Sequence, residues 1–317
     1  MSVERIERVD GRLHVRVVAP DAHQRRAAVV LVHGICLSGQ VWRNWAPALA
    51  ARGIEAWCPD LRAHGDSAGR DELKRTSMDD YAADIEAVLD AAGSQAVVGH
   101  DLGGLVAQMI AARRPLRGIA LLGSFSSRNV SGTRSITQLW RNLRPRYLEA
   151  MFRGKPWQPT PDDMAVLALG RLDDAMRAEV TSWMCPESGL AAREVGVAGV
   201  PVDEAAIRCP VLVAAMTQDR FTPPPRQRLI SQRYRADYVE FAQHAHFPML
   251  EDGWERPAAV VGRWLEEAAR LGEERTKGSM TRLAALQGRD PTGTPTASPR
   301  PPVTSAPDLT DGSERKA

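Results

Sequence analysis

The sequence predicts an α/β fold in which a mostly parallel sheet carries helices on both faces. Short, wholly apolar runs such as "AAVVLVHG" and "GIEAWCPD" alternate with helical patterns along the chain. Strands that are buried on both faces are typical of parallel sheets covered by helices. With 317 residues, of which 44% are hydrophobic and 25% charged, the chain is long enough to bury a full core of this kind.

The first predicted elements are a hairpin and two helices. The opening "RIERVDGRLHVRVVAP" alternates in two runs that Asp10-Gly11 joins, which is a strong hairpin signal. A helical pattern over residues 41–51 separates the first two apolar runs. The segment "SMDDYAADIEAVLDAAG" predicts a helix with Asp79 and Asp80 near its amino end, where the helix dipole favours them. One face of this helix carries Tyr81, Ile85, Val88 and Leu89.

The stretch "AVVGHDLGGLVAQMI", residues 96–110, predicts a strand, a very tight turn and a helix. Asp101 stands at the apex of the turn, and Gly99 and Gly103 would let the two backbones pack closely. A nucleophile elbow of the pattern G-x-S-x-G has the same form with serine at its centre. The turn therefore presents a carboxylate where a serine is usual.

A change of pattern divides the chain into three parts. From about residue 125 the sequence becomes irregular and bears tryptophans, with helical pieces such as "ITQLWRNL" and "PDDMAVLALGRL", before strand signals resume with "CPVLVAA" and "DYVEFA". A closing helix is predicted by "ERPAAVVGRWLEEAARL". We expect a core from residues 1–124 and 208–272, a helical cap insertion over 125–207, and a tail over 273–317. Because the tail is rich in Pro, Thr, Ser and Gly, we expect it to be disordered.

The charge balance and the cysteines favour small-molecule chemistry in the cytoplasm. Lys+Arg 41 against Asp+Glu 39 gives a net charge of +2, so no nucleic acid or membrane partner is expected. The four cysteines form no C-x-x-C pair, the amino-terminal segment is charged, and no apolar run approaches the roughly 18 residues that span a bilayer. No cluster has metal-ligand spacing, so we expect no metal and no cofactor. The sequence leaves open whether the chain forms a homodimer.

Several motifs together resemble the α/β-hydrolase family, from the first hairpin to about Leu271. "LVHGICLSGQVW" resembles the His-Gly turn of this family, and "PDLRAHGDS" resembles the loop one strand later. "GHDLGG" occupies the elbow, "VLVAAMTQDRFTPP" ends a strand with an aspartate in the position of the triad acid, and "QHAHFPMLE" carries the histidine. This order of motifs is specific. The resemblance implies an α/β-hydrolase fold with a mostly parallel eight-stranded sheet and an inserted helical cap.

The resemblance implies a catalytic triad of Asp101, Asp219 and His246. Asp219 follows a buried strand and precedes Phe-Thr-Pro-Pro, and its alternative role is that of a turn-capping aspartate. His246 is preferred over His244 because the family pattern is a histidine with glutamate five positions on, here Glu251.

An aspartate at the elbow suits a different substrate from a serine. Asp101 is ionised at neutral pH and can attack a saturated carbon that bears a strained or good leaving group, which forms an ester. His246, oriented by Asp219, would then activate water, while the backbone N–H groups of Ile35 and Leu102 stabilise the oxyanion. The family's epoxide hydrolases and several dehalogenases share the pattern "G-H-D-x-G". We therefore predict an epoxide-hydrolase-like enzyme acting on a small hydrophobic molecule.

Two departures from the family pattern bear on this prediction. Haloalkane dehalogenases usually have tryptophan after the nucleophile and fluoroacetate dehalogenases have arginine, whereas Leu102 stands here, so dehalogenation is disfavoured. Cys36 replaces the proline of many epoxide hydrolases, and we interpret it as a small buried residue rather than a nucleophile.

The predicted cap supplies few candidate site residues. Epoxide opening needs an acid, which the family draws from cap tyrosines, commonly two, and Tyr147 alone lies in this cap. Tyr147 is thus a candidate acid, with packing of the cap as the alternative. The candidate pocket-lining residues are His100, Trp140, Trp157 and Trp183.

Other functions fit the same residues. Asp101 and His246 could transfer protons in an elimination, isomerisation or cyclisation without a covalent intermediate. The segments "VPVDEAAIRCPVLV" and "HFPMLEDGWERPAAVV" resemble ester-bond or carbon–carbon-bond hydrolases of the family. A ligand-binding protein that has lost hydrolysis, with Asp101 in a structural role, is the alternative from outside the enzymes.

Overall fold

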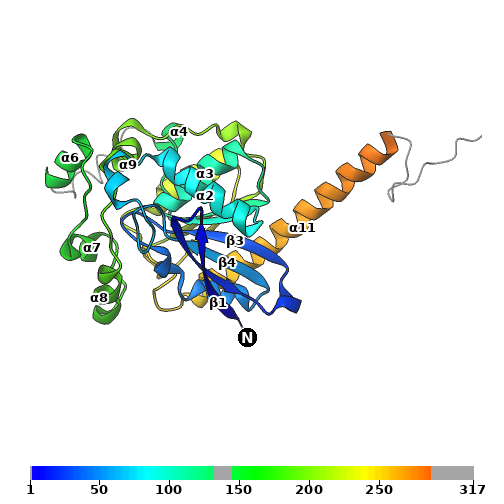
Figure 1. The fold of residues 1–317 in the computed structure, drawn as a ribbon, viewed down its shortest axis with the longest axis horizontal. Coiled ribbons are helices and arrows are strands. Elements are labelled where there is room, and N and C mark those ends of the chain that lie inside the picture. The colour runs from blue at the N-terminus through cyan, green and yellow to red at the C-terminus, as the bar shows by residue number, and fades with distance from the viewer. Residues whose placement is uncertain (1, 132–144, 287–317) are drawn as a thin grey trace, which may run out of the picture. The chain divides into compact units, whose positions relative to one another are not determined.

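An eight-stranded sheet forms the centre of the molecule (Figure 1). The computed structural model describes residues 2–131 and 145–286. The strands are β1 (Val3–Val9), β2 (Leu13–Ala19), β3 (Ala27–Val32), β4 (Ile54–Pro59), β5 (Ala96–His100), β6 (Gly118–Leu122), β7 (Val211–Met216) and β8 (Asp237–Phe241). Their order is β1-β2-β4-β3-β5-β6-β7-β8, antiparallel from β1 to β4 and parallel from β4 to β8. The predicted mostly parallel sheet is confirmed.

The hairpin of β1 and β2 turns at the predicted dipeptide. Val9 pairs with Leu13, and the turn between them has positive φ angles of 52° at Asp10 and 68° at Gly11. Asp10, Gly11 and Arg12 thus connect the strands, and Arg12 N donates to Val9 O over 3.1 Å across the two left-handed residues, which reverse the chain direction. The local sequence thus fixes the edge of the sheet, and the hairpin prediction is confirmed.

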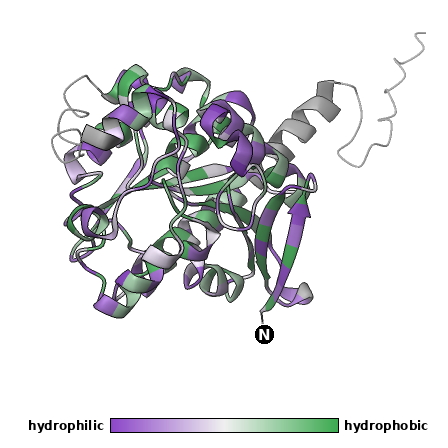
Figure 2. Ribbon diagram, turned by 60° about the vertical axis from the view of Figure 1, so that its left-hand side comes forward, coloured by the Kyte–Doolittle hydropathy of each residue, from purple (hydrophilic) through white to green (hydrophobic). Residues whose placement is uncertain are grey.

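Helices cover both faces of the sheet, and alternate strand residues enter different cores. Val30 and Val97 pack in a core with α2 and α3, whereas Val29 and Val98 pack in a core with α1 and α11. The helices are α1 (Trp45–Ala50), α2 (Met78–Ala92), α3 (Leu102–Arg113), α10 (Pro224–Tyr234) and α11 (Glu255–Leu286), with short 3-10 turns η1 (Ala22–Gln24), η2 (Gly39–Trp42) and η3 (Arg70–Arg75). Figure 2 accordingly shows hydrophobic residues concentrated on the central strands. This period-two burial explains the wholly apolar strand sequences.

Local signals set where two of these helices begin. Ser77 caps α2: its hydroxyl accepts from Asp80 N over 3.2 Å, while the Asp80 carboxylate accepts from Ser77 N over 2.9 Å. This reciprocal capping box satisfies two backbone donors that the helix cannot. The helix expected over 41–51 is instead split into η2 and α1, because Pro47 fits only the first turn of a helix.

The chain between β6 and β7 forms a group of short helices. They are α4 (Arg128–Ser131), α6 (Pro145–Phe152), α7 (Pro161–Leu167), α8 (Asp174–Ser182) and α9 (Gly189–Arg193), followed by the turns η4 (Glu194–Ala198) and η5 (Glu204–Ala206). Figure 1 shows α6, α7, α8 and α9 together beside the sheet. The helical signal in "PDDMAVLALGRL" falls on α7, whereas "ITQLWRNL" lies outside the described residues.

The last helix extends farther than the sequence predicted. We expected a tail without structure from residue 273, but α11 runs to Leu286. The physical reason is the local composition. The segment "GEERTKGSMTRLAAL", residues 272–286, is rich in good helix formers, and from Gly272 on the first proline is Pro291. The remainder of the predicted tail, 287–317, lies outside the described residues. Within the described chain no helix, α11 included, is both long and apolar enough to cross a membrane.

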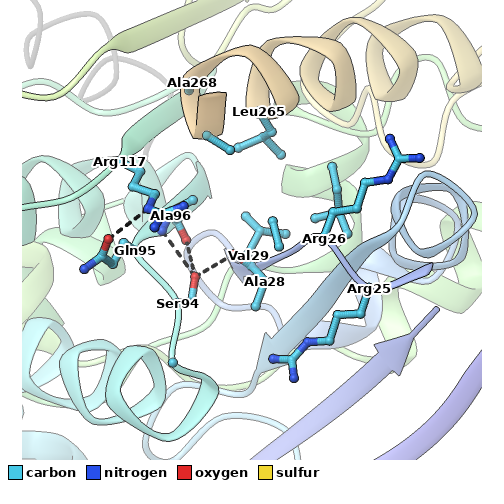
Figure 3. A pocket seen from close by; sticks show the side chains of 14 residues that line it. Arg25, Arg26, Ala28, Val29, Ser94, Gln95, Ala96, Arg117, Leu265 and Ala268 are labelled. Atoms are coloured by element: carbon cyan, nitrogen blue, oxygen red, sulfur yellow. Dashed lines mark hydrogen bonds between the residues drawn. The ribbon is translucent and has the colours of Figure 1, made fainter. Parts of the chain in front are cut away.

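A hollow of about 440 Å³ opens at the amino edge of the parallel strands. Figure 3 shows Leu265 of α11 above it and Arg117 beside it. At the base of the hollow, the Ser94 hydroxyl donates to Ala28 O over 2.8 Å and so links the segment before β5 to β3. Asp101 follows the last residue of β5, at the opposite strand ends. This hollow is therefore separate from the predicted catalytic residues.

We expect Gly103→Ala to destabilise the fold strongly. A Cβ at this position would lie 2.4 Å from Val32 O and 2.6 Å from His33 O, both rigid strand-end carbonyls. Overpacking of this kind should lower the free energy of unfolding by about 2 kcal/mol or more. Urea denaturation measures this, and Gly170→Ala is the control because its nearest atom, Ala165 O, is 3.9 Å away. Equal stability of the two variants would contradict the packing argument.

Candidate active site

Asp101 lies between β5 and α3 in a strained backbone conformation. Its φ of 54° and ψ of −115° belong to a region that residues with a side chain rarely adopt. The two flanking glycines make the turn possible, since a Cβ on Gly99 would lie 2.2 Å from Gly103 O. The elbow therefore accepts no larger residue at either position, and it presents the aspartate at the carboxyl edge of the sheet.

The Asp101 carboxylate is fully buried but only partly hydrogen-bonded. Ile35 N donates to its Oδ2 over 3.0 Å, whereas its Oδ1 has no hydrogen-bond partner among the described residues. Gly34 permits this close approach, because a Cβ there would lie 2.8 Å from Oδ2. One oxygen is thus held by the loop that follows β3, and the other is left without a partner.

Burial changes the acidity of Asp101. Loss of hydration raises its pKa from the ordinary 3.8 to about 6, although the charge of His246 and the nearby backbone N–H groups of Ile35 and Leu102 act in the opposite direction. At neutral pH the carboxylate is therefore mostly ionised, yet it takes up a proton far more readily than an exposed aspartate does.

Asp219 and His246 form a buried pair beside it. His246 Nδ1 donates to Asp219 Oδ2 over 2.9 Å, and both side chains are almost completely buried. Asp219 also accepts from Thr222 through its N–H (2.9 Å) and its hydroxyl (2.7 Å). Burial alone would raise the pKa of Asp219, but the charge and hydrogen bond of His246 outweigh it and lower the pKa to about 2. Asp219 is thus an ionised, fixed acceptor that orients the imidazole ring.

The pKa of His246 is raised by the same neighbours. Burial opposes the charged ring, but the negative charges of Asp219 and then Asp101 outweigh burial. Because Nδ1 is bound to Asp219, Nε2 is the ring nitrogen that remains for proton transfer. The three residues that lie far apart in the sequence therefore interact electrostatically in one dry site.

Glu251 and His100 hold the backbone and ring of His246. The Glu251 carboxylate accepts from Ala245 N (2.7 Å) and Phe247 N (3.0 Å), on either side of the histidine. His100 donates from Nε2 to His246 O over 2.7 Å, with the two rings 4.6 Å apart. The other candidate histidine, His244, faces Glu251 instead, with its Nδ1 3.4 Å from Glu251 Oε2. The glutamate spacing that selected His246 thus has a physical basis.

The predicted cap residues have other partners. The Tyr147 hydroxyl donates to Asp163 and accepts from Thr160 N, at the start of α7. Trp157 packs on Tyr147, with ring centroids 5.4 Å apart. These contacts favour the packing alternative for Tyr147.

The remaining candidates are spread more widely. Arg43 stacks on Trp183, 5.1 Å from its ring, and Trp183 belongs to the core shared with α1 and α11. Trp140 lies outside the described residues. Burial raises the pKa of the Cys36 thiol well above its usual range, which disfavours a nucleophilic thiolate.

Some site residues were not found from the sequence. Thr222, which binds Asp219 twice, stands in the "DRFTPP" motif only three positions after the acid, and that spacing was a usable signal. His14, Asp60 and Asp66 also bring three potential ligand atoms within 4.8 Å of one another, a grouping that no spacing indicated. Asp60 already accepts from the backbone N–H groups of Gly39 (2.7 Å) and Asp66 (2.9 Å), which accounts for its burial.

The elbow, the sheet and the buried Asp–His pair are the features of a hydrolase of the α/β class. The family model of the alpha/beta hydrolase family matches residues 29–263, and the chain belongs to this family.

Two relatives from Mycobacterium tuberculosis are similar to part of the chain. Identity to epoxide hydrolase B is 32% over 151 residues, which is 46% of this chain and 42% of that protein. Identity to lipase LipV is 35% over 112 residues, 35% of this chain and 40% of that protein. The chain thus matches less than half the length of these relatives.

Solved structures share the fold at lower identity. An esterase from Thermogutta terrifontis matches with a TM-score of 0.60 and 20% identity, over 85% of this chain and 99% of that one. Epoxide hydrolase VrEH1 from Vigna radiata matches with a TM-score of 0.61 and 18% identity, over 84% and 98%. At this identity the comparison establishes the fold alone.

We expect Asp101→Asn to stabilise the protein at neutral pH. Since the folded state raises the pKa of Asp101 from 3.8 to about 6, its contribution to stability is full below about pH 4 and is lost as pH rises through 6. The advantage of the variant should therefore grow between these pH values, by about 3 kcal/mol at roughly 1.4 kcal/mol per pKa unit. Urea unfolding at pH 4 and pH 8 measures it.

The matched control is Asp219→Asn, whose effect on stability should change with pH in the opposite direction. Because the pKa of Asp219 is lowered to about 2, its ionised form stabilises the folded state above its unfolded pKa, and Asp219→Asn should be destabilising at neutral pH. If both variants shifted stability in the same direction with pH, the charge assignment of the site would be wrong.

Proposed function

We propose that this protein hydrolyses a small hydrophobic molecule with an epoxide-like electrophile through a covalent ester on Asp101. The observation that carries the proposal is the Asp101 carboxylate itself, fully buried at the elbow, with Oδ2 bound to Ile35 N and Oδ1 without a partner in the part of the chain that the structure describes. The partial similarity to epoxide hydrolase B supports the same substrate class.

In the first step, Asp101 Oδ1 attacks a carbon of the strained ring. A C–O ester bond forms, the ring C–O bond breaks, and its electron pair leaves on the oxygen, which takes up a proton from solvent. A carboxylate suits this step because it is already ionised above about pH 6, so no base is needed for the attack. The buried site also leaves the anion poorly solvated and hence more reactive.

In the second step, His246 activates water. While Asp101 is ionised, its charge contributes to the raised pKa of His246. Esterification removes that charge, so the pKa of His246 falls and the neutral ring can accept a proton from water. The hydroxide attacks the ester carbonyl, the N–H groups of Ile35 and Leu102 stabilise the oxyanion, and the diol leaves as Asp101 is regenerated. His246 then returns its proton to solvent, which balances the proton taken up in the first step.

A second candidate function is proton transfer without a covalent intermediate. It is favoured by the pKa of Asp101, about 6, which lets the carboxyl group both give and take a proton near neutral pH. The hydrogen bonds of the Tyr147 hydroxyl to Asp163 and Thr160 also favour proton transfer. Epoxide opening in this family usually needs a tyrosine as the acid, and this hydroxyl is already bound elsewhere.

We expect His246→Gln to trap the ester, because it leaves attack intact but removes the base. Incubation with 4-nitrostyrene oxide should add the mass of the substrate to His246→Gln and not to Asp101→Asn, as measured by intact-protein mass spectrometry. Diol formation should fall by about 10³-fold in both variants. His244→Gln is the matched control, since its ring contacts Glu251 rather than Asp219, and it should retain turnover.

A single turnover in ¹⁸O-labelled water separates the two candidates. One oxygen of the diol is always that of the epoxide, so a diol that contains no ¹⁸O received its second oxygen from Asp101 and supports the ester route. Turnover without a diol and without a mass adduct, but still dependent on Asp101 and His246, would instead support proton transfer. Cleavage that is indifferent to Asp101 would exclude both.

A further inference from the structure

A second buried charged group lies next to the loop that binds Asp101. Glu187 belongs to the segment between α8 and α9 and is completely buried. Its backbone forms an isolated antiparallel bridge with Trp157, through bonds of 3.0 and 2.7 Å. A buried carboxylate is costly unless it is paired and hydrogen-bonded, so its partners have to account for it.

The Glu187 carboxylate joins the inserted segment to three parts of the core. Its Oε1 accepts from the Tyr81 hydroxyl of α2 (2.5 Å) and from Ser188 N (2.8 Å). Its Oε2 accepts from Cys36 N (3.3 Å), in the loop after β3, and lies 3.4 Å from His64 Nε2, in the loop after β4. Both oxygens are therefore occupied by groups distant in sequence.

The surroundings of His64 favour a positive charge on its ring, although its Nε2 faces Glu187 across 3.4 Å without a hydrogen bond among the described residues. Its Nδ1 lies 3.0 Å from Arg62 O, and a carbonyl can only accept, so Nδ1 carries a proton. In a neutral ring the lone pair of Nε2 would then face the carboxylate of Glu187, which is repulsive. Although burial opposes the charge, Glu187 raises the pKa of His64, and His64 in turn holds the pKa of Glu187 below its ordinary value despite burial.

The neighbouring histidine has the opposite state. His33 Nδ1 donates to Gly34 O (2.8 Å) while its Nε2 accepts from Leu61 N (3.0 Å), which only a neutral ring can do. Burial and the charge of His64 lower the pKa of His33 to about 4. Of the two histidines, His64 is thus the one that the surroundings favour as the positive partner of Glu187.

The pair acts on the peptide next to Ile35. Cys36 has a φ of 59°, a left-handed conformation that is unusual for a residue with a side chain. Both polar groups of Cys36 are held by the inserted segment: its N–H by Glu187, and its carbonyl by Cys185 N over 2.9 Å. The preceding N–H, that of Ile35, is the one that binds Asp101.

We propose that the His64–Glu187 ion pair is a positioning device by which the inserted segment fixes the Ile35 N–H against the nucleophile. Glu187 and His64 are positioning residues and touch no substrate. A buried ion pair adds little net stability, so its contribution is specificity of geometry. The catalytic part of this inference rests on the proposed function, whereas the effect on the Ile35 N–H does not.

The test is Glu187→Gln, which keeps the shape of the side chain and removes its charge. We expect kcat for 4-nitrostyrene oxide to fall by about tenfold to a hundredfold with KM changed less than about twofold, because a misplacement of about 1 Å costs on that order. Hydrogen exchange at the Ile35 amide, measured by NMR without substrate, should accelerate by about tenfold relative to amides of β6. Tyr81→Phe, which removes one anchor of Glu187, should give smaller changes in the same direction.

The matched control is Glu179→Gln. Glu179, on α8, pairs with Arg43 of the core and so also links the inserted segment to the core, but this pair is half-exposed and does not contact the Ile35 loop. It should leave both kcat and Ile35 exchange unchanged.

Several outcomes decide the inference. Unchanged Ile35 exchange in Glu187→Gln and Tyr81→Phe overturns it, as does the same acceleration in Glu179→Gln, which would indicate general loosening. If Glu187→Gln does not fold, Tyr81→Phe decides alone. If Ile35 exchange accelerates but the wild type forms no diol, the positioning role stands and the reaction assignment fails.

Discussion

The close contact of three backbone segments around the Asp101 carboxylate is the constraint on which the rest of the site depends. A Cβ on Gly34, Gly99 or Gly103 would meet neighbouring atoms at 2.8 Å or less. Because no side chain separates these segments, a charged group is held in a dry space by a backbone N–H rather than by a counter-charge at contact distance. The raised pKa of Asp101 and the burial of His246 both follow from this packing.

The electrostatics of the site form one coupled system. Asp219 is kept ionised by His246 and Thr222, and it raises the pKa of the histidine, while Asp101 adds to the same effect. A change of charge at any one group therefore alters the proton affinity of the others. Chemistry at Asp101 changes the basicity of His246 without movement of either side chain.

The sequence predicted what local signals determine. The Asp10-Gly11 hairpin, the helix that begins near Asp79 and Asp80, and the elbow around Asp101 each depend on residues a few positions apart, and the structure has all three. Pairings across long separations carry no such signal. His64 and Glu187 stand in unrelated segments, and nothing in either segment indicates that they meet. The end of α11 was missed because composition favoured a tail where helix propensity prevailed.

The attachments of the inserted segment to the core differ in kind along its length. Near α9 it is fastened by Cys185 N to Cys36 O, by the Ser188 hydroxyl to Thr76 O over 2.5 Å, and by Glu187. Lifting this end would expose unpaired charges and backbone groups together, so its opening would be a rare, cooperative event. The α8 end is held differently, by the half-exposed Arg43–Glu179 pair and by apolar residues such as Val180 that pack in the core with α1 and α11. Separation of the inserted segment from the core would thus break polar contacts at the α9 end and expose apolar surface at the α8 end.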